Sequence, residues 1–234
     1  MTPAAYLPPA SGRRRIETAR WILDAGSRDA FLTGLRFEPD SAPSVLTDVR
    51  RRAPGLPLTL TTERADLAGA FRALGFDDPA PPIAATCAAL ALDHAPPATT
   101  GIEVRRVATY DEFLVGLDIE DTVFGYSRRD EAAAIYEQRR AGPREEWLAF
   151  CYGRAVAYGS AVAGPLGLYL SGGGTLPDAR GRGAYRALVR ARWEHAVKLG
   201  TPALVVHAQD ASRPILEQLG FRRVATIHEL ELAA

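Results

Sequence analysis

The stretch 175–188 constrains this chain more than any other, because it predicts a strand end, a basic glycine turn and a helix, in that order. Gly181 and Gly183 leave room for the backbone to approach a ligand closely. The first N–H groups of the helix have no partner inside it and carry the positive end of its dipole. Three arginines add full charges around the same point: Arg180, Arg182 and Arg186. The stretch predicts a phosphate-binding turn, although a Gly-x-Gly turn alone is equally compatible with a plain connection.

Charge and composition restrict the partners. The 234 residues hold 28 basic and 28 acidic side chains, so no global field attracts nucleic acid or an anionic membrane, and any anion site must be local. No apolar run approaches the roughly 20 residues of a membrane span, and the N-terminus lacks a signal pattern. Cys87 and Cys151 lie far apart in apolar or small-residue surroundings, so neither a disulfide framework nor a metal site is expected. These features favour a cytoplasmic protein with buried thiols.

The segment 93–101 is rich in proline and small residues and predicts a linker. Beyond it, periodicity and turn signals predict strands at 102–107, 147–152, 155–163, 166–171 and 203–208, helices at 110–123, 129–140, 184–199 and 212–219, and one or two closing strands over 221–232. The fold class expected from this order is α/β of the α+β type.

The residues before the linker repeat part of this order. Gly55-Leu56-Pro57 resembles Gly200-Thr201-Pro202, and each is followed, at the same separation, by a helix that ends in Leu-Gly-Phe. We interpret this as a duplication. Where the second copy has its basic turn, the first has the acidic, glycine-free segment 38–44. We therefore expect residues 1–92 to form a smaller, degenerate half-domain without a phosphate site, ahead of a domain at 102–234.

From residue 102 onward the chain resembles the GNAT superfamily of acetyl-CoA-dependent N-acetyltransferases. The resemblance rests on Leu176-Pro177, the turn Arg180-x-x-Gly183 with its helix, the apolar strand to Ala208, and Leu219-Gly220-Phe221. The family signature continues with Gly or Ala where this chain has Tyr185. The resemblance implies a GNAT fold, a mixed, mostly antiparallel sheet flanked by helices, with a degenerate GNAT-like half-domain before it.

The resemblance also implies the cofactor site. The turn would bind the pyrophosphate of coenzyme A, and the pantetheine arm would run between the strands that end near Gly173 and Ala208, pairing with amides at 170–174. Acetyl-CoA is the expected co-substrate, without a metal. The residues expected to bind it are Gly173, Thr175, Leu176, Arg180, Gly181, Arg182, Gly183, Ala184, Tyr185 and Ser212.

The implied reaction is direct attack of a primary amine, on a small molecule or a peptide, at the acetyl carbonyl. The ammonium must first lose a proton, so a base is needed. The candidate catalytic residues are Glu120, Tyr169 and His207. Each has a plainer interpretation: a solvated helix charge, a packing aromatic or a hydrogen-bonded strand histidine.

A general acid is harder to find. Many members of the family carry a tyrosine four residues before the glycine of Leu-Gly-Phe, where this chain has Leu216. Tyr185, Tyr169 or Ser212 would have to replace it, or the thiolate would leave unassisted. Two alternatives stay open: a non-catalytic acetyl-CoA-binding protein, and a transferase for longer acyl groups. The sequence identifies neither the acceptor amine nor the oligomeric state, and a homodimer is left open.

Overall fold

The computed structural model describes residues 13–79, 86–165, 167–210 and 212–234. Its contacts divide the chain into two packing units that alternate along the sequence. The first unit holds the described residues up to Ala89, together with His207–Arg213 and Arg223–Ala234, and the second holds Leu90–Val206 and Pro214–Arg222. The sequence domains 1–92 and 102–234 stay a prediction, and the packing units differ from them because the last strand joins the first unit.

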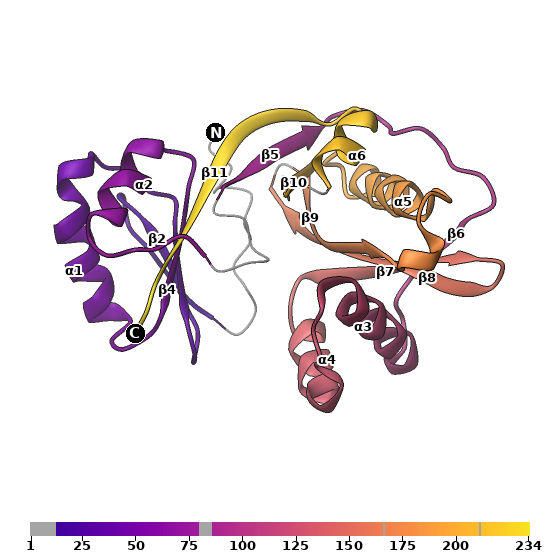
Figure 1. Cartoon of the computed structure of the whole chain (residues 1–234), viewed down its shortest axis with the longest axis horizontal. Helices are drawn as coiled ribbons and strands as arrows, with labels where there is room; N and C mark the ends of the chain where they lie inside the picture. The colour runs from indigo at the N-terminus through magenta and orange to yellow at the C-terminus, as the bar shows by residue number, and fades with distance from the viewer. Residues whose placement is uncertain (1–12, 80–85, 166, 211) are drawn as a thin grey trace. The chain divides into compact units, whose positions relative to one another are not determined.

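The first unit is a mixed sheet covered on one face by two helices (Figure 1). Its elements are β1 (Arg14–Glu17), β2 (Ile22–Ala25), β3 (Ala30–Thr33), α1 (Ala42–Arg52), β4 (Leu58–Thr62), α2 (Ala65–Arg72) and most of β11 (Arg222–Leu232). Strands β3 and β4 are parallel, whereas β11 pairs antiparallel with β4 and places Leu230 opposite Leu60. Both leucines are fully buried, so the C-terminal strand completes the core of this unit.

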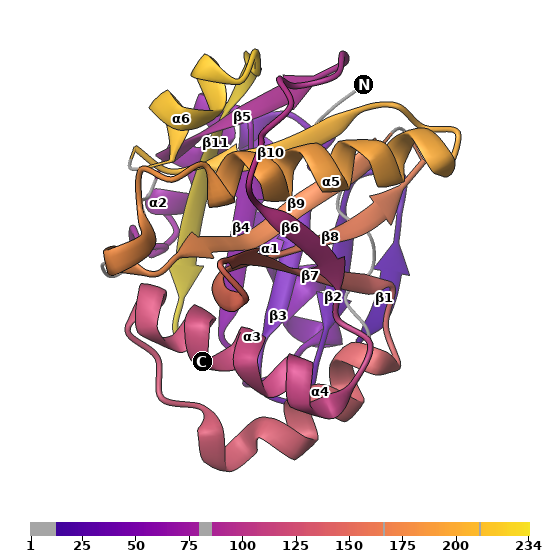
Figure 2. The same cartoon turned by 90° about the vertical axis from the view of Figure 1, so that its right-hand side faces the viewer.

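The second unit has strands in the order β10-β9-β8-β7-β6, with helices on both faces. In Figures 1 and 2, α5 lies on one face and α3 and α4 on the other. Its elements are the end of β5 (Thr86–Leu92), β6 (Glu103–Arg106), α3 (Tyr110–Phe124), α4 (Ala132–Arg140), β7 (Arg144–Cys151), β8 (Arg154–Gly164), β9 (Gly167–Thr175), α5 (Ala184–Lys198), β10 (Leu204–Ala208) and α6 (Arg213–Gln218). Only the β9–β10 pair among these five strands is parallel.

Beyond residue 102 the elements agree with the sequence-based predictions to within one or two residues except at three ends. Helix α4 begins at Ala132 rather than 129, because residues 129–131 form a separate 3-10 turn before it. Strand β7 begins at Arg144 rather than 147, because the charged side chains at its start find ionic partners. Strand β9 runs through the glycines to Thr175 rather than ending at 171, because β8 stays paired with it on both sides of a bulge. The bulge is formed by Gly172 and Gly173, which lie between the pairs Ser171–Ser160 and Gly174–Tyr158.

The two halves share local geometry where the sequence repeats. Gly55 and Gly200 have φ of +68° and +77°, and the glycines of the two Leu-Gly-Phe motifs have φ of +91° and +97°. In the first half β4, which follows Gly55, pairs parallel with β3, and in the second half β10, which follows Gly200, pairs parallel with β9. A helix lies between the two strands of each pair in the sequence. Among the described residues, however, none between Gly34 and Gly55 has a positive φ, so the left-handed glycine turn belongs to the second half alone.

Cys87 is half-buried, Cys151 is buried, and both are free thiols. Burial raises the pKa of the Cys87 thiol to about 11. Within the described ranges, no helix has the length and apolar character needed to cross a membrane.

Candidate functional site

Strand β9 loses its parallel neighbour halfway along its length. Pairing with β10 joins Leu168 to Leu204 and Tyr169 to Val205, and the last recorded pair is Leu170 with Val206. On its other side β9 stays paired with β8 as far as Thr175. Among the described residues, no strand pairs with the groups of 171–175 that face away from β8, although the Thr175 carbonyl accepts a hydrogen bond from Arg180 Nε at 3.4 Å. This edge is therefore open to a ligand that adds as a short strand.

Glycines in this open part let side chains from both faces approach the backbone. A Cβ on Gly173 would lie 2.9 Å from the Tyr185 ring of α5, and one on Gly174 would lie 2.7 Å from Val123 Cγ1 of α3. Contacts of that length do not occur between real side chains, so glycine is required while both neighbours stay in place. Helices α3 and α5 thus fix the position of the open strand.

The glycine turn follows directly. Gly181 and Gly183 have φ of +78° and +87°. Nothing lies within 4 Å of a Cβ built on Gly181, and only Thr99 Cγ2, at 3.9 Å, approaches one on Gly183. Gly183 is the N-cap of α5 and offers no capping side chain, so the N–H groups of the first turn, beginning at Ala184, point out of the helix without partners.

Three exposed arginines surround this turn: Arg180, Arg182 and Arg186. Among the described residues, no carboxylate lies within ion-pair distance of any of them. Asp178 is attracted by Arg182 but is paired with Arg154. The turn therefore combines backbone donors, a helix dipole and net positive charge, which is the chemistry of a phosphate site.

Thr175 and Leu176 connect the open strand to the turn. The N–H of Leu176 donates to the Val156 carbonyl at 2.9 Å and so continues the pairing with β8. The Thr175 hydroxyl is buried and has no hydrogen-bond partner among the described residues. A buried hydroxyl without a partner is costly, and a bound ligand or water would satisfy it.

Glu120, predicted as a catalytic candidate, is buried in an arginine cluster. Its Oε2 lies 2.7 Å from Arg128 and 2.8 Å from Arg139, and its Oε1 lies 3.5 Å from Arg144. Burial acts to raise the pKa of this carboxyl, but the three guanidinium groups outweigh it and lower the pKa. Glu120 is therefore an anion at neutral pH and a weak base.

The same cluster contains a buried tyrosine that the sequence analysis missed. Tyr158 Oη accepts hydrogen bonds from Arg139 at 3.0 Å and from Arg144 at 3.2 Å, and it donates to Glu146. Burial raises the pKa of Tyr158, so the phenol is neutral. A Cβ on Gly172, whose φ is +59°, would lie 3.0 Å from both Glu120 Oε1 and Arg144 Nη2. The cluster therefore reaches the open part of β9.

The signal for this cluster was a run of charges at the start of a strand that becomes apolar, Arg144-Glu145-Glu146, together with a tyrosine inside the apolar strand β8. Arg192 gave a similar signal, because it shares the apolar stripe of α5 with Leu188. It is fully buried, donates to the carbonyls of Leu188 (3.0 Å) and Ser160 (3.1 Å), and binds α5 to β8. Burial lowers the pKa of Arg192.

The other predicted residues lie at separate places. Tyr169 is half-buried and lies in the part of β9 that is paired on both sides, before the open edge. His207 lies in β10, and burial lowers its pKa to about 4. Ser212 donates to the Gln209 carbonyl at 3.2 Å in the turn before α6. His207 and Ser212 group with the first packing unit, and their roles stay predictions.

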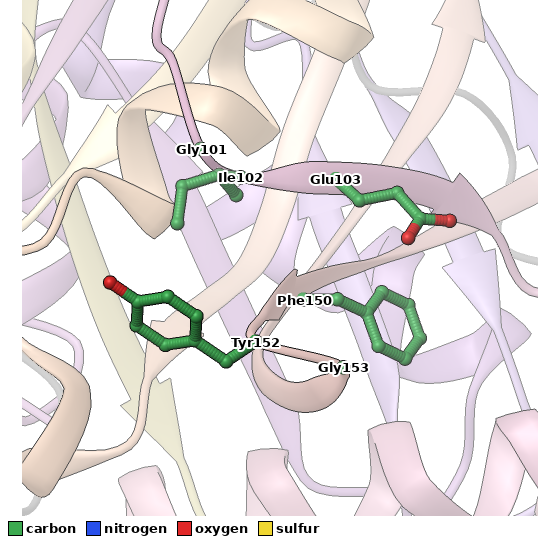
Figure 3. A pocket seen from close by; sticks show the side chains of 6 residues that line it. All are labelled: Gly101, Ile102, Glu103, Phe150, Tyr152 and Gly153. Atoms are coloured by element: carbon green, nitrogen blue, oxygen red, sulfur yellow. The ribbon is translucent and has the colours of Figure 1, made fainter.

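A separate concavity lies at the start of β6 and the β7–β8 turn (Figure 3). It measures about 490 Å³ and is open, and Tyr152 at its rim is 96% exposed with a φ of +50°. Its one ionisable acid is Glu103, so its lining holds no acid–base pair, and we assign it no chemistry. The described residues also contain no cluster of three His, Cys, Asp or Glu side chains that could hold a metal.

No family model and no curated protein matches this sequence. Solved structures do match. A GCN5-related N-acetyltransferase from Kribbella flavida is 18% identical over 94% of this chain and 89% of its own, with a TM-score of 0.71. One from Sphaerobacter thermophilus is 16% identical over 91% and 76%, with a TM-score of 0.62.

A tandem GNAT protein from the clavulanic acid biosynthesis pathway is 14% identical over 97% of this chain and 84% of its own, with a TM-score of 0.62. This chain has the GNAT fold. The predicted fold is thereby confirmed, and the match to a tandem GNAT protein fits a chain built from two halves.

The contact between Gly174 and Val123 gives a first prediction. Gly174→Ala adds a methyl group against the stiff side chain of Val123 and should lower the free energy of unfolding by about 1–3 kcal/mol. In a Val123→Ala background, Gly174→Ala should cost little further stability, because the Cγ1 atom that it would contact is gone. Gly69→Ala, on an exposed helical position with nothing near its Cβ, should instead stabilise by about 0.5–1 kcal/mol. Urea unfolding measures all three, and a harmless Gly174→Ala would contradict the packing described.

The charges around Glu120 predict that a substitution of this residue lowers the free energy of unfolding by an amount that depends on pH. Because the folded-state pKa of Glu120 is lowered, its stabilisation is present above its unfolded pKa and is lost as the pH falls through the folded pKa. Glu120→Gln should cost about 3 kcal/mol at pH 7, because it removes the carboxylate that the three guanidinium groups share, and clearly less near pH 3. Glu194→Gln, in an exposed pair with Arg190, should cost under about 1 kcal/mol at both. Urea unfolding at the two pH values decides, and an equal penalty at both would refute the assignment.

Proposed function

We propose that this chain is an N-acetyltransferase that moves an acetyl group from acetyl-CoA to a primary amine of a small molecule or peptide by direct transfer. One observation carries the proposal: within a GNAT fold, the open edge of β9 leads directly into a left-handed glycine turn at the N-terminus of α5. An open strand edge suits the amides of a pantetheine arm, and the turn suits its pyrophosphate. We expect it to act in the cytoplasm, without nucleic acid or membrane partners.

Different residues of the chain would bind different parts of acetyl-CoA. The N–H groups around Gly183, Ala184 and Tyr185, with the three nearby arginines, would hold the pyrophosphate. The groups of 171–175 on the open side would hold the arm in register. An N–H of the same segment would stabilise the oxyanion that forms during attack.

Proton transfer limits how Glu120 can act. Its lowered pKa makes it a weak base, so we propose that it attracts the acceptor's ammonium to the bulge at Gly172, and that the proton leaves to water. Leu216 is fully buried and offers no proton to the departing thiolate. Tyr185 is the candidate acid, because its ring lies against Gly173; burial raises the pKa of its phenol, which keeps the proton on it at neutral pH. Tyr169 and His207 are kept as weaker candidates for catalysis.

A panel of primary amines tests the activity. With acetyl-CoA present, free thiol should appear only when an acceptor is added, and in proportion to the acetylated amine found by mass spectrometry. Tyr185→Phe should lower kcat by about 10-fold or more while leaving the KM for acetyl-CoA nearly unchanged, since removal of a general acid affects the chemical step. Acceptor-independent thiol release, or none, would count against the transferase.

A non-catalytic acetyl-CoA-binding protein is the second candidate. It is favoured by two observations: Leu216 replaces the expected acid, and Glu120 is held by three arginines. Calorimetric binding of acetyl-CoA without acceptor-dependent thiol release across the panel would support it. The same assay with propionyl- and butyryl-CoA tests the third possibility, a transferase for longer acyl groups.

Binding at the turn is tested by Gly183→Glu. The substitution puts a side chain and a negative charge in front of the N–H groups, so affinity for coenzyme A should fall at least about 100-fold by calorimetry. Gly200→Glu is the matched control, because Gly200 has a similar φ of +77° and nothing within 4 Å of its Cβ, but lies at the other end of α5. The control should bind normally. A folded Gly183→Glu variant with wild-type affinity would overturn the site.

A further inference from the structure

A small cavity lies beside the Glu120 cluster, between the C-terminal part of α4, the loop after β6 and the start of β7. It has a volume of about 100 Å³, room for a group of a few heavy atoms. Its lining is strongly charged and consists of Arg106, Val107, Ala108, Tyr136, Arg139, Arg140, Arg144, Glu145 and Glu146. None of the roles discussed above uses it.

Positive charge exceeds negative charge in this lining. Arg106 and Glu145 pair at 2.9 Å, and Arg139 and Arg144 lie near both Glu146 and Glu120, which leaves Arg140 as the fourth arginine of the lining. The Glu146 carboxylate is already engaged by Arg139 at 2.7 Å and by the Tyr158 hydroxyl. Arg140 donates to Tyr136 Oη at 3.1 Å, and no described carboxylate lies within ion-pair distance of it. Arg140 is exposed and is attracted by Glu137 on the same helix, but its guanidinium has no close ion pair among the described residues and can bind an anion at the cavity.

Arg144 supplies a second, independent observation. Its Nε is buried and has no hydrogen-bond acceptor in the part of the chain that the structure describes, and Glu146 Oε1, 3.7 Å away, is too far to accept. A buried donor of this kind calls for an acceptor from a ligand or water. The Nη2 of the same guanidinium lies 3.0 Å from a Cβ position on Gly172, at the bulge of β9. One side chain thus connects the cavity to the open strand.

We propose that this cavity binds a carboxylate of the acceptor, so that the acceptors are amines that carry a carboxylate, such as amino acids. The inference rests on the proposed transferase function. A carboxylate matches the cavity in size and charge, and it accepts hydrogen bonds from adjacent guanidinium donors in a planar geometry that suits Arg140 and Arg144. The anionic Glu120 beside Gly172 attracts the ammonium group of the acceptor. The acceptor is therefore oriented with its carboxylate in the cavity and its ammonium group at Glu120.

Calorimetry on the full chain, saturated with coenzyme A, tests the site without requiring turnover. The probes are ω-amino acids with three to six carbons, each compared with the n-alkylamine of the same length. At least one amino acid should bind about tenfold or more tightly than its matched amine. Arg140→Gln should remove this difference, whereas Arg129→Gln should keep it, because Arg129 is an exposed arginine that pairs with Asp118 outside the cavity.

The outcomes separate this inference from the proposed function. Equal affinities, no binding of any probe, or a preference that survives Arg140→Gln would overturn the carboxylate site. Should the preference hold but no bound amino acid become acetylated when acetyl-CoA replaces coenzyme A, the site would stand and the transferase function would fail. Should alkylamines be acetylated as readily as amino acids, the transferase would stand and the acceptor class would fail.

Discussion

The end of the β9–β10 pairing at Leu170 and Val206 is the constraint on which the candidate site depends. A parallel strand inside a sheet normally satisfies its backbone groups on both sides, and an open edge inside a fold is costly unless something pairs with it. Here β8 holds one side of β9 to its end while the other side is left open, and α3 and α5 press against its glycines from opposite faces. The strand is therefore rigid and open at once, which is the state that a ligand joining as a strand requires.

The charged cluster around Glu120, on the face that α3 and α4 cover, fixes the geometry of the site more than it stabilises the fold. Desolvating Glu120, Glu146 and three arginines costs about as much as their attractions return, so the net gain in stability is small, whereas loss of a single member is expensive. Such a network favours one arrangement of α3, α4 and β7, because both oxygens of Glu120 and the Oε1 of Glu146 are held by arginine side chains. The result is that an anion and a guanidinium stay fixed beside Gly172, where chemistry at the open strand would take place.

Local signals predicted much of this molecule. Hydrophobic periodicity located the helices and strands of 102–234, and the turn at Gly181 and Gly183 was evident because glycine, arginine and a helix start are contiguous in the sequence. The run through Gly172 to Thr175 was different, since glycine normally ends a strand and only pairing with β8 shows that it continues. Glu120 was found, but not its partners, because Arg128, Arg139 and Arg144 reach it through the fold. The interleaving of the two packing units was equally invisible, because β11 pairs with β4 over a long separation in sequence.

The contact between Tyr185 and Gly173 explains how a large side chain fits where the family signature has a small one. In the structure the large side chain, Tyr185, is on helix α5, and the strand residue that faces it, Gly173, has no side chain. The ring of Tyr185 occupies the volume that a side chain at 173 would fill. Because Gly173 leaves this space empty, the strand and the helix pack without a void around the large ring. The contact has a chemical consequence, since it brings a phenol to the backbone of the open strand. A residue that looks like a departure from the signature therefore adds a polar group next to the segment where a pantetheine arm would lie, and the loss of a tyrosine at Leu216 need not leave the site without a proton donor.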